Sequence, residues 1–455
     1  MSRISQIKIF IKNKLGSSEK KNILSSISWL FFDKVLRLGV GLVVGVWVAR
    51  YLGPFTYGSW NYVIAFVGVF SAFATMGLDS VVVRELIESP EKHSSILGTV
   101  FIIRLSGSLL TCVLATGFFI IFNTGSTELI EIILISSASL ILQSIDVIDL
   151  YFQSRVESKF TVIAKNTSFL IFALIRVLLI ISKSSLIAFV WCSLLEIALS
   201  EIILIAIFYI KKLKVTSWRL DLALGKQFLD KGWRLTLSGL MISIYMRIDQ
   251  VMLGIMAGKK IVGIYTAGVR IAEVWYFIPL AILTSVYPLL VTAKKESPDR
   301  YTLRLKQLFF YLSLISIAIS IIINIFSAFI INMFFGSDYM QSAQILSVTI
   351  WAGVFVFLGV GGSQALVIDE LYNLLMIRTI VGAVSNIGLN LFLIPRYQGL
   401  GASYATLIAY ALSGFLLNFF NRQTRGLFYI QLRSLFFIDQ ILRLKKLTLV
   451  KITKN

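Results

Sequence analysis

Apolar residues fill most of the chain in long runs, and a short polar connection separates each run from the next. Each run is close to the roughly 20 residues that an α-helix needs to cross the hydrocarbon core of a bilayer. Twelve runs are separable: 24–50, 58–78, 96–121, 128–153, 161–181, 185–210, 232–257, 264–292, 307–335, 341–366, 371–395 and 400–420. A helix satisfies its own backbone hydrogen bonds in lipid. The pattern therefore predicts an all-α integral membrane protein with about twelve transmembrane helices.

The composition supports a membrane protein over a soluble one. Hydrophobic residues make up 57% of the 455 residues and charged residues only 15%, whereas soluble domains hold about 45–50% and about 25%. The net charge is +20, which in a soluble protein would suggest a nucleic-acid partner. Here the basic residues lie mainly in short connections and tails. We therefore expect membrane lipid as the surroundings and no nucleic-acid partner.

The distribution of Lys and Arg predicts the orientation in the membrane. With the N-terminus inside, the inside segments hold 29 basic residues and the outside connections hold 4. Both termini are thus predicted to be cytoplasmic, which requires an even number of spans. The first apolar run is long and no small-residue cleavage site follows it. We expect it to be a permanent span rather than a cleaved signal peptide.

A glycine pattern recurs in two connections that lie 205 residues apart. Gly53-Pro-Phe-Thr-Tyr-Gly58-Ser-Trp60 follows the first span, and Gly258-Lys-Lys-Ile-Val-Gly263-Ile-Tyr265 follows the seventh. Glycine suits a tight turn because it accepts positive φ, and the aromatic residue suits the membrane interface. Recurrence at spans one and seven predicts two parallel six-helix bundles around a central cavity, an arrangement known in transporters.

This organisation divides the chain into five parts. We expect a basic cytoplasmic N-terminal tail, an N-terminal lobe, a cytoplasmic linker, a C-terminal lobe and a basic cytoplasmic tail at 1–23, 24–210, 211–231, 232–420 and 421–455. Within the last part, Leu427–Leu447 mixes apolar and basic residues. Two descriptions of this segment stay open: an amphipathic helix on the inner leaflet, or a partly disordered basic tail.

Many charged residues lie inside the predicted spans, although each costs at least about 2.5–3.5 kcal/mol at the bilayer centre. The basic ones are Lys34, Arg37, Arg104, Lys165, Arg176, Arg247, Arg270 and Arg378, and the acidic ones include Asp33, Asp146, Asp149, Glu196, Glu201, Asp249 and Glu273. Helical spacing places Asp33 with Arg37, and Arg270 with Glu273, on shared faces. Asp146 and Asp149 also share a face, as like charges, so one of them could carry a proton.

Two explanations for these charges remain open. Any single residue is well explained as part of an interhelical ion pair or as a side chain that snorkels near a span end. The whole set is better explained by a polar cavity, in which arginine would bind phosphate through its bidentate fork. The predicted substrate-binding residues are Arg37, Arg104, Arg176, Arg247, Arg270 and Arg378. The candidates for ion pairing or for coupling to an ion gradient are Asp33, Asp146, Asp149, Asp249 and Glu273.

The sequence offers little for enzyme chemistry. Its one histidine, His93, lies in a connection, and Cys112 and Cys192 lie in apolar runs. Walker A, GxSxG, HExxH and CxxC motifs are absent from the sequence, so ATP hydrolysis, acyl transfer and zinc chemistry lack their usual residues. We therefore predict no enzyme activity, no metal and no cofactor.

Several stretches carry a family resemblance: Val48-Ala-Arg-Tyr-Leu-Gly-Pro-Phe-Thr-Tyr-Gly58, Met76-Gly-Leu-Asp79, Tyr245-Met-Arg-Ile-Asp-Gln-Val-Met-Leu-Gly254 and Ala272-Glu-Val-Trp-Tyr-Phe-Ile-Pro279. From about Lys20 to about Phe420 the chain resembles the lipid-linked oligosaccharide repeat-unit flippases of O-antigen and capsule synthesis (Wzx type). These belong to the multidrug/oligosaccharidyl-lipid/polysaccharide exporter superfamily.

The resemblance implies a carrier in the bacterial cytoplasmic membrane. Its substrate would be an undecaprenyl-diphosphate-linked repeat unit, moved from the inner to the outer leaflet by alternating access, with the polysaccharide polymerase machinery as a further partner. The family fold implies a V of two six-helix bundles around a cationic cavity, to which Arg37, Arg247 and Asp249 would contribute.

Two other functions, drug export and polysaccharide polymerisation or ligation, fit the sequence less well than a flippase. A drug exporter of the same superfamily would need a cavity of net acidic character for cationic drugs, which the charges in these spans do not predict. A membrane polysaccharide polymerase or ligase would display a long outer loop with basic and histidine residues. The predicted outer connections are only a few residues long and contain no histidine.

Overall fold

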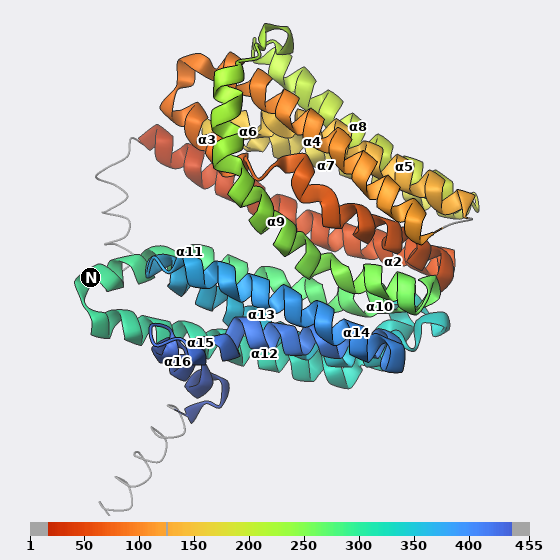
Figure 1. The fold of residues 1–455 in the computed structure, drawn as a ribbon, viewed down its shortest axis with the longest axis vertical. Helices are drawn as coiled ribbons and strands as arrows, with labels where there is room; N and C mark the ends of the chain where they lie inside the picture. The colour runs from red at the N-terminus through yellow and green to blue at the C-terminus, as the bar shows by residue number, and fades with distance from the viewer. Residues whose placement is uncertain (1–16, 124–125, 439–455) are drawn as a thin grey trace, which may run out of the picture. The chain divides into compact units, whose positions relative to one another are not determined.

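The computed structural model describes residues 17–123 and 126–438, and within these ranges every regular element is a helix (Figure 1). The α-helices are α2 (Ser17–Thr75), α3 (Asp79–Glu88), α4 (His93–Phe122), α5 (Thr127–Leu142), α6 (Val147–Ser154), α7 (Lys159–Ile181), α8 (Leu186–Ile210), α9 (Leu222–Met256), α10 (Lys259–Glu273), α11 (Phe277–Glu296), α12 (Pro298–Phe335), α13 (Ser342–Ile368), α14 (Tyr372–Ala411), α15 (Leu417–Phe420) and α16 (Arg425–Leu435). Short 3₁₀ turns are η1 (Pro90–Lys92), η2 (Gln143–Asp146), η3 (Val215–Ser217), η4 (Val274–Tyr276) and η5 (Ser337–Tyr339). A π-helical turn, η6 (Leu412–Leu416), lies between α14 and α15.

Ten helical stretches of the described chain are long and apolar enough to cross a membrane. Two are far longer than the roughly 20 residues of one crossing: Phe32–Glu88 has 57 residues and Tyr372–Phe420 has 49. Each contains a residue with non-helical backbone angles, Gly53 in the first and Gln398 in the second. Both residues lie in connections expected from the sequence. The structure confirms a multi-pass helical membrane protein, and the count of twelve spans stays a prediction.

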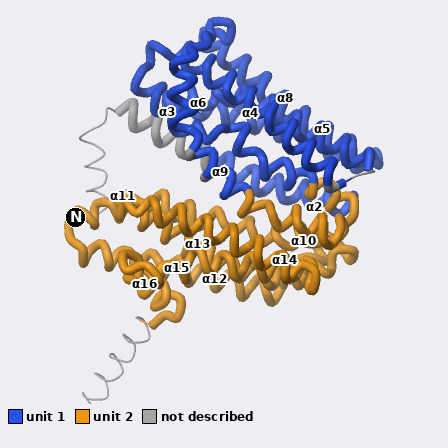
Figure 2. The backbone as a smooth tube through the Cα atoms, in the orientation of Figure 1, with its two compact units in different colours: residues 1–52, 63–243 blue, residues 53–62, 244–455 orange. Residues whose placement is uncertain are grey.

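The described residues form two compact units (Figure 2). Unit 1 contains residues of 1–52 and 63–243, and unit 2 contains 53–62 and residues of 244–455. A short piece of α2, 53–62, therefore packs with the C-terminal helices. The predicted lobes, the linker and their six-helix content stay predictions. The N-terminal tail up to residue 16 lies outside the described residues.

Each unit has its own apolar core. In unit 1 the fully or almost fully buried residues include Leu78, Val82, Val100, Phe152 and Phe208. In unit 2 they include Leu290, Phe309, Leu312, Phe357 and Leu358. Burial of apolar area stabilises each unit, at roughly 25 cal/mol per Å².

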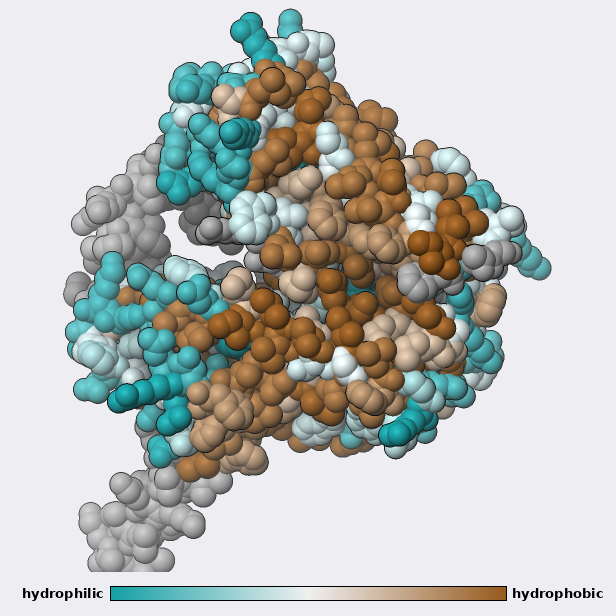
Figure 3. Space-filling view, in the orientation of Figure 1, coloured by the Kyte–Doolittle hydropathy of each residue, from teal (hydrophilic) through white to brown (hydrophobic). Residues whose placement is uncertain are grey.

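Large apolar side chains are also abundant on the outside of the helices. Leu174, Ile181 and Phe392 are 68%, 72% and 70% exposed. On the face drawn in Figure 3, apolar side chains cover the middle of the helices and hydrophilic ones gather near helix ends. An apolar surface of this extent is unfavourable in water and is expected where lipid is the solvent.

The first glycine of each repeated motif adopts the positive φ that its turn role predicts. The φ angle is +72° at Gly53 and +92° at Gly258. A residue with a Cβ is disfavoured in this region of backbone space. Gly53 breaks α2, and Gly258 separates α9 from α10. The recurrence in the sequence thus corresponds to a recurrence in backbone conformation.

The start of the C-terminal tail forms a helix that packs on unit 2. In α16, the fully buried Gln431 donates to the carbonyl oxygen of Leu358 at 3.1 Å and accepts from Asn418 at 2.8 Å. The Phe428 ring stacks on Phe415 with centroids 4.8 Å apart. These contacts place α16 against α13, η6 and α15. Location on a membrane surface stays a prediction for this helix, and residues 439–455 lie outside the described part.

Candidate functional site

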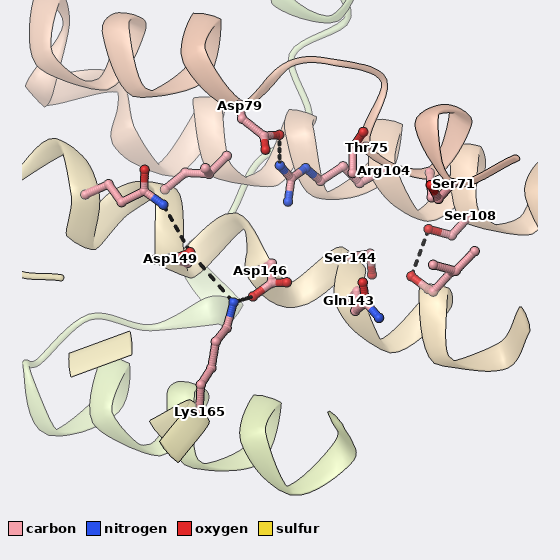
Figure 4. A pocket seen from close by; sticks show the side chains of 14 residues that line it. Ser71, Thr75, Asp79, Arg104, Ser108, Gln143, Ser144, Asp146, Asp149 and Lys165 are labelled. Atoms are coloured by element: carbon pink, nitrogen blue, oxygen red, sulfur yellow. Dashed lines mark hydrogen bonds and ion pairs between the residues drawn. The ribbon is translucent and has the colours of Figure 1, made fainter. Parts of the chain in front are cut away.

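A polar cavity of about 360 Å³ lies within unit 1 (Figure 4). Eleven of its fourteen lining residues are polar or charged. They come from α2, α3, α4, α5, η2, α6 and α7. The volume falls at the small end of the roughly 300–1,000 Å³ typical of small-molecule pockets, whereas the lining is far more polar than usual. We name this cavity the unit 1 pocket.

One side of the unit 1 pocket is formed by Arg104 and Asp79. Arg104, on α4, is only 4% exposed and pairs through Nη2 with Oδ1 of Asp79. Asp79 is the first residue of α3, where a carboxylate is favoured by the helix dipole, and its side chain is 60% exposed. Nε of Arg104 is buried without a hydrogen-bond partner among the described residues. Arg104 therefore retains an unused donor beside the cavity.

The facing side contains Lys165 between two carboxylates (Figure 4). Nζ of Lys165, on α7, lies 2.7 Å from Oδ1 of Asp146 and 3.8 Å from Oδ2 of Asp149. The two aspartates are three residues apart and share a face, as their spacing predicts. Gln153, one turn further along α6, donates to Asp149 at 3.1 Å. The lining thus holds three carboxylates and two basic groups, a net charge of −1.

A further buried carboxyl lies close to this region. Glu201 on α8 is 3% exposed, and its Oε2 has no partner among the described residues. Glu201 interacts electrostatically with Asp146 and Lys165. Each basic group of the unit 1 pocket is paired with a neighbouring aspartate, and substrate binding by Arg104 stays a prediction.

In unit 2, Asp249 is the centre of a buried hydrogen-bond network. It is 7% exposed and accepts from Asn390 at 2.6 Å, from Tyr265 at 2.8 Å and from Thr406 at 2.5 Å. Asn390 also donates to Asn386 at 3.1 Å. No Lys or Arg of the described chain forms an ion pair with Asp249. Donors from α10 and α14 therefore hold a carboxyl that has no cationic partner.

The hydroxyl of Thr406 faces two acceptors with one hydrogen. Its Oγ1 lies 2.5 Å from Oδ2 of Asp249 and 2.9 Å from the carbonyl oxygen of Ala402. If Asp249 is ionised, Thr406 donates to it; if Asp249 is protonated, it can donate to Thr406, which then donates to Ala402. The same geometry satisfies both protonation states.

Two further predicted residues are paired with neighbours inside unit 1. Arg37 lies 2.7 Å from Asp33, the i,i+4 contact that their spacing predicts, and its guanidinium lies 5.2 Å from the centre of the Phe169 ring. Arg176 of α7 lies 2.6 Å from Glu196 of α8, and the two side chains are 16% and 17% exposed. The Arg176–Glu196 pair joins α7 to α8, whereas Arg37 and Asp33 lie on the same helix and Arg37 contacts α7 through the Phe169 ring. A role in substrate binding stays a prediction for both arginines.

The expected pairing of Arg270 with Glu273 is not formed, although both residues are described. Arg270 instead donates through Nη1 to the hydroxyl of Tyr57 at 2.8 Å. Tyr57 belongs to the 53–62 segment that packs with unit 2, so a tertiary partner competes with the i,i+3 neighbour. Arg247 is exposed, forms no ion pair within the described chain, and acts on Glu273 only through its charge.

Arg378 donates hydrogen bonds through its guanidinium group to the backbone of the π-helical turn η6. It is 7% exposed, and its Nε donates to the carbonyl oxygen of Ser413 at 2.6 Å and its Nη2 to that of Gly414 at 3.3 Å. A π-helical turn displaces carbonyl groups from the regular hydrogen-bond pattern, and a guanidinium can satisfy two of them. Substrate binding by Arg378 stays a prediction.

Sequence reasoning missed the polar partners of these charges. Asp79 and Lys165 were visible as charged residues but were not assigned to a site, and Asn390 and Thr406 were not considered. Tyr265 was considered only as the aromatic residue of the second glycine motif, suited to the membrane interface, whereas the structure buries it against Asp249. Asn386 and Asn390 are one helical turn apart in an otherwise apolar run, and that pattern could have signalled a polar face. Among the described residues, no group of three or more His, Cys, Asp or Glu side chains is arranged to hold a metal ion.

Comparisons with known proteins place these features in a family context. Residues 23–294 match the family described as polysaccharide biosynthesis protein. No curated protein matches the chain. Among solved structures, the chain is similar to the lipid II flippase MurJ in an inward closed conformation, with a TM-score of 0.70, 17% identity and 91% of each chain covered.

Two transporters show the same likeness. An inward-facing multidrug resistance MATE family transporter of the MOP superfamily has a TM-score of 0.65 and 16% identity, with 92% of this chain and 99% of that chain covered. A MOP superfamily transporter from Pyrococcus furiosus has a TM-score of 0.57 and 15% identity, with 91% and 96% covered. At these identities the likeness concerns the fold, which is that of the MOP-superfamily transporters.

Proposed function

Because the chain belongs to the family of polysaccharide biosynthesis proteins, we propose that it is a flippase for lipid-linked oligosaccharides. It moves undecaprenyl-diphosphate-linked repeat units from the inner to the outer leaflet of the bacterial cytoplasmic membrane by alternating access. The product serves O-antigen or capsular polysaccharide synthesis, beside the polymerase machinery. Both termini are cytoplasmic, in agreement with the distribution of basic residues.

The observation that carries this proposal is the unit 1 pocket. Helices of membrane-spanning length surround it, yet eleven of its fourteen lining residues are polar or charged. Polar groups at membrane depth are costly and are typical of substrate or ion pathways. A polar headgroup that must cross the bilayer would find hydrogen-bond partners there, while a polyprenyl tail can stay in lipid.

For the diphosphate we propose Arg37 and Arg247. Arg247 is exposed and forms no ion pair with another described residue. The Arg37 side chain is 35% exposed, and its one ion pair among the described residues is with Asp33 on the same helix. A contact of this kind stabilises by only about 0.3–0.5 kcal/mol. A phosphate can therefore compete for both guanidinium groups at low cost.

For energy coupling we propose Asp249. Its hydrogen-bond network can accommodate either protonation state of the carboxyl group. The three side chains that donate to the carboxylate oxygens of Asp249 come from α10 and α14. Asp146 and Glu273 are the less favoured alternatives, because Asp146 is already paired with Lys165 and Glu273 is exposed. A transport rate that does not change when proton or sodium gradients are imposed would contradict the proposal that transport is coupled to an ion gradient.

Export of small cationic molecules is a second candidate. The unit 1 pocket carries one more carboxylate than basic groups, and one of the similar structures is a multidrug resistance transporter. Both observations favour a cationic substrate. Reduced accumulation of a fluorescent cationic dye in cells that express the protein would support this candidate over a flippase.

The flippase proposal is tested with purified protein in liposomes. Undecaprenyl diphosphate that carries a fluorescent sugar is placed in both leaflets, and a membrane-impermeant reductant bleaches the outer pool. We expect the protein to expose the inner pool over time, at a rate that an imposed ion gradient changes. The same bleaching in protein-free liposomes and in liposomes with the protein would contradict the proposal.

A further inference from the structure

We propose that the unit 1 pocket binds an uncharged, hydroxyl-rich sugar of the substrate and not its diphosphate. This inference rests on the proposed flippase function and adds a sugar-binding site to it. The chemical class of ligand is a neutral hexose or N-acetylhexosamine unit. The inference is carried by the charge, depth and unused donors of the pocket.

The charge of the pocket excludes a diphosphate as its best ligand. Arg104 is neutralised by Asp79, and Lys165 lies between Asp146 and Asp149. A ligand with two or more negative charges would meet a lining of net charge −1 and would have to displace at least one aspartate from its base. The displaced carboxylate and the phosphate would then repel each other at short range. A neutral ligand avoids this cost.

A free metal cation also fits poorly. The position between Asp146 and Asp149 is taken by the ammonium group of Lys165, and the described residues contain no metal-binding group of three or more acids, histidines or cysteines. The pocket thus has its charged groups paired with one another, and it is rich in groups that form hydrogen bonds. This is the chemistry that recognises hydroxyl groups.

The pocket has an exposed rim and a buried polar floor. Thr75, Asp79 and Gln153 are exposed, whereas Ser108 and Ser144 are 1% and 2% exposed. Buried polar groups in lipid-embedded helices need partners, and the serines of the floor use backbone carbonyl groups: Ser108 donates to Leu140 at 2.9 Å and Ser144 to Ile141 at 2.7 Å. Their lone pairs remain available to ligand hydroxyl groups.

Two side chains of the pocket keep hydrogen-bonding capacity that the protein does not use. Nε of Arg104 is buried without a partner among the described residues, in a residue 4% exposed. Gln143 is half-buried, and its side chain makes no hydrogen bond to another described residue. An orphaned buried donor is unfavourable unless water or a ligand satisfies it. Arg104 and Gln143 together offer donors and an acceptor to adjacent sugar hydroxyl groups.

The rim lies where a substrate would load from inside the cell. Asp79 begins the connection 79–95, and Gln153 precedes the connection 154–160, both predicted to be cytoplasmic from their basic residues. A lipid-linked sugar is expected to approach from that side. A pocket that opens there can select the sugar before transport begins.

Binding of three defined lipids to the purified protein tests the inference by native mass spectrometry. The probes are polyprenyl diphosphate alone, the same lipid with one hexose, and the same lipid with one N-acetylhexosamine. We expect at least one glycosylated lipid to bind more tightly than the bare lipid. Gln143→Ala should weaken only the glycosylated lipid, by about three- to tenfold for one lost hydrogen bond.

The matched control is Gln344→Ala, which removes an exposed glutamine of α13 in unit 2. It should bind all three lipids as the unaltered protein does. Equal binding of bare and glycosylated lipids by the unaltered protein would overturn the sugar pocket while leaving the flippase function standing. Equal weakening of all lipids by Gln143→Ala would also overturn it. Failure of the unaltered protein to bind any of the three lipids would instead contradict the proposed function.

A second measurement locates the sugar. Thr75→Cys places a thiol at the exposed rim of the pocket, and Cys112, which is half-buried, is replaced by Ser in the same protein. The glycosylated lipid should slow labelling of this thiol, and the bare lipid should not. Equal labelling rates with both lipids would show that the cavity is only solvated and would overturn the inference.

Discussion

Gly58 and Gly263 hold the two copies of the repeated glycine motif against each other. A Cβ built on Gly58 would lie 1.9 Å from the carbonyl oxygen of Lys259, and one built on Gly263 would lie 2.0 Å from that of Pro54. Pro54 follows Gly53 as Lys259 follows Gly258, so the two contacts are reciprocal, like those across a two-fold axis. The recurrence in the sequence is therefore also a packing contact within unit 2.

Substitution of either glycine should destabilise unit 2. Gly58→Ala or Gly263→Ala places a methyl group on a backbone carbonyl, and overpacking of this kind costs about 1–3 kcal/mol or more. The expected result is a lower unfolding temperature in detergent. Gly117→Ala is the control, because a Cβ at Gly117 in α4 meets no atom within 4 Å. An unchanged unfolding temperature for Gly58→Ala would show that the close contact is absent.

The Arg176–Glu196 pair should act as a structural unit. Arg176→Met leaves Glu196, whose side chain is 17% exposed, without its partner, which costs up to about 3–5 kcal/mol. The double variant Arg176→Met/Glu196→Gln removes both charges and should recover most of the loss. A double-mutant cycle on unfolding temperature or chemical unfolding measures the coupling. If the double variant is no more stable than the single one, the ion pair does not stabilise unit 1.

Neutralisation of Arg37 and Arg247 together should abolish surface polysaccharide. Arg37→Gln/Arg247→Gln removes the two guanidinium groups proposed for the diphosphate, and the protein should still be inserted in the membrane at normal amounts. Complementation of a flippase-null strain, with the membrane fraction blotted for the protein, provides the measurement. The control Arg84→Gln/Arg300→Gln alters two exposed arginines that also form i,i+4 pairs. Full complementation by the first variant would contradict a role for these arginines.

Replacement of Asp249 should make transport insensitive to the ion gradient that is proposed to drive it. Asp249→Asn has nearly the same shape but cannot ionise, so the network with Tyr265, Thr406 and Asn390 can persist in only one state. Stimulation of flipping by an imposed proton or sodium gradient should fall about tenfold or more, the effect of roughly 1.4 kcal/mol of lost coupling. Asp299→Asn, at an exposed position in α12, should keep the stimulation. If the gradient stimulates flipping by Asp249→Asn as strongly as by the unaltered protein, Asp249 does not couple transport to the gradient.

Helical spacing predicted one contact between near neighbours in the chain but did not decide another. The Asp33–Arg37 pair follows from helical spacing, since both residues lie on one face of a continuous helix. The same spacing allowed Arg270 and Glu273 to share a face, but no ion pair forms between them, and Arg270 donates instead to Tyr57, in a segment more than 200 residues away. Spacing shows which residues can meet, and competing tertiary partners decide whether they do.

The sequence by itself determined the membrane fold class and the turn conformation of the repeated glycines, and the orientation in the membrane stays a prediction from its basic residues. Hydropathy, charge and glycine content act locally, so they can be read along the chain. Only the tertiary structure decided that Asp79 pairs with Arg104, that Lys165 lies between Asp146 and Asp149, and that donors from α10 and α14 surround Asp249. These partners come from separate helices, and their meeting depends on how the helices pack.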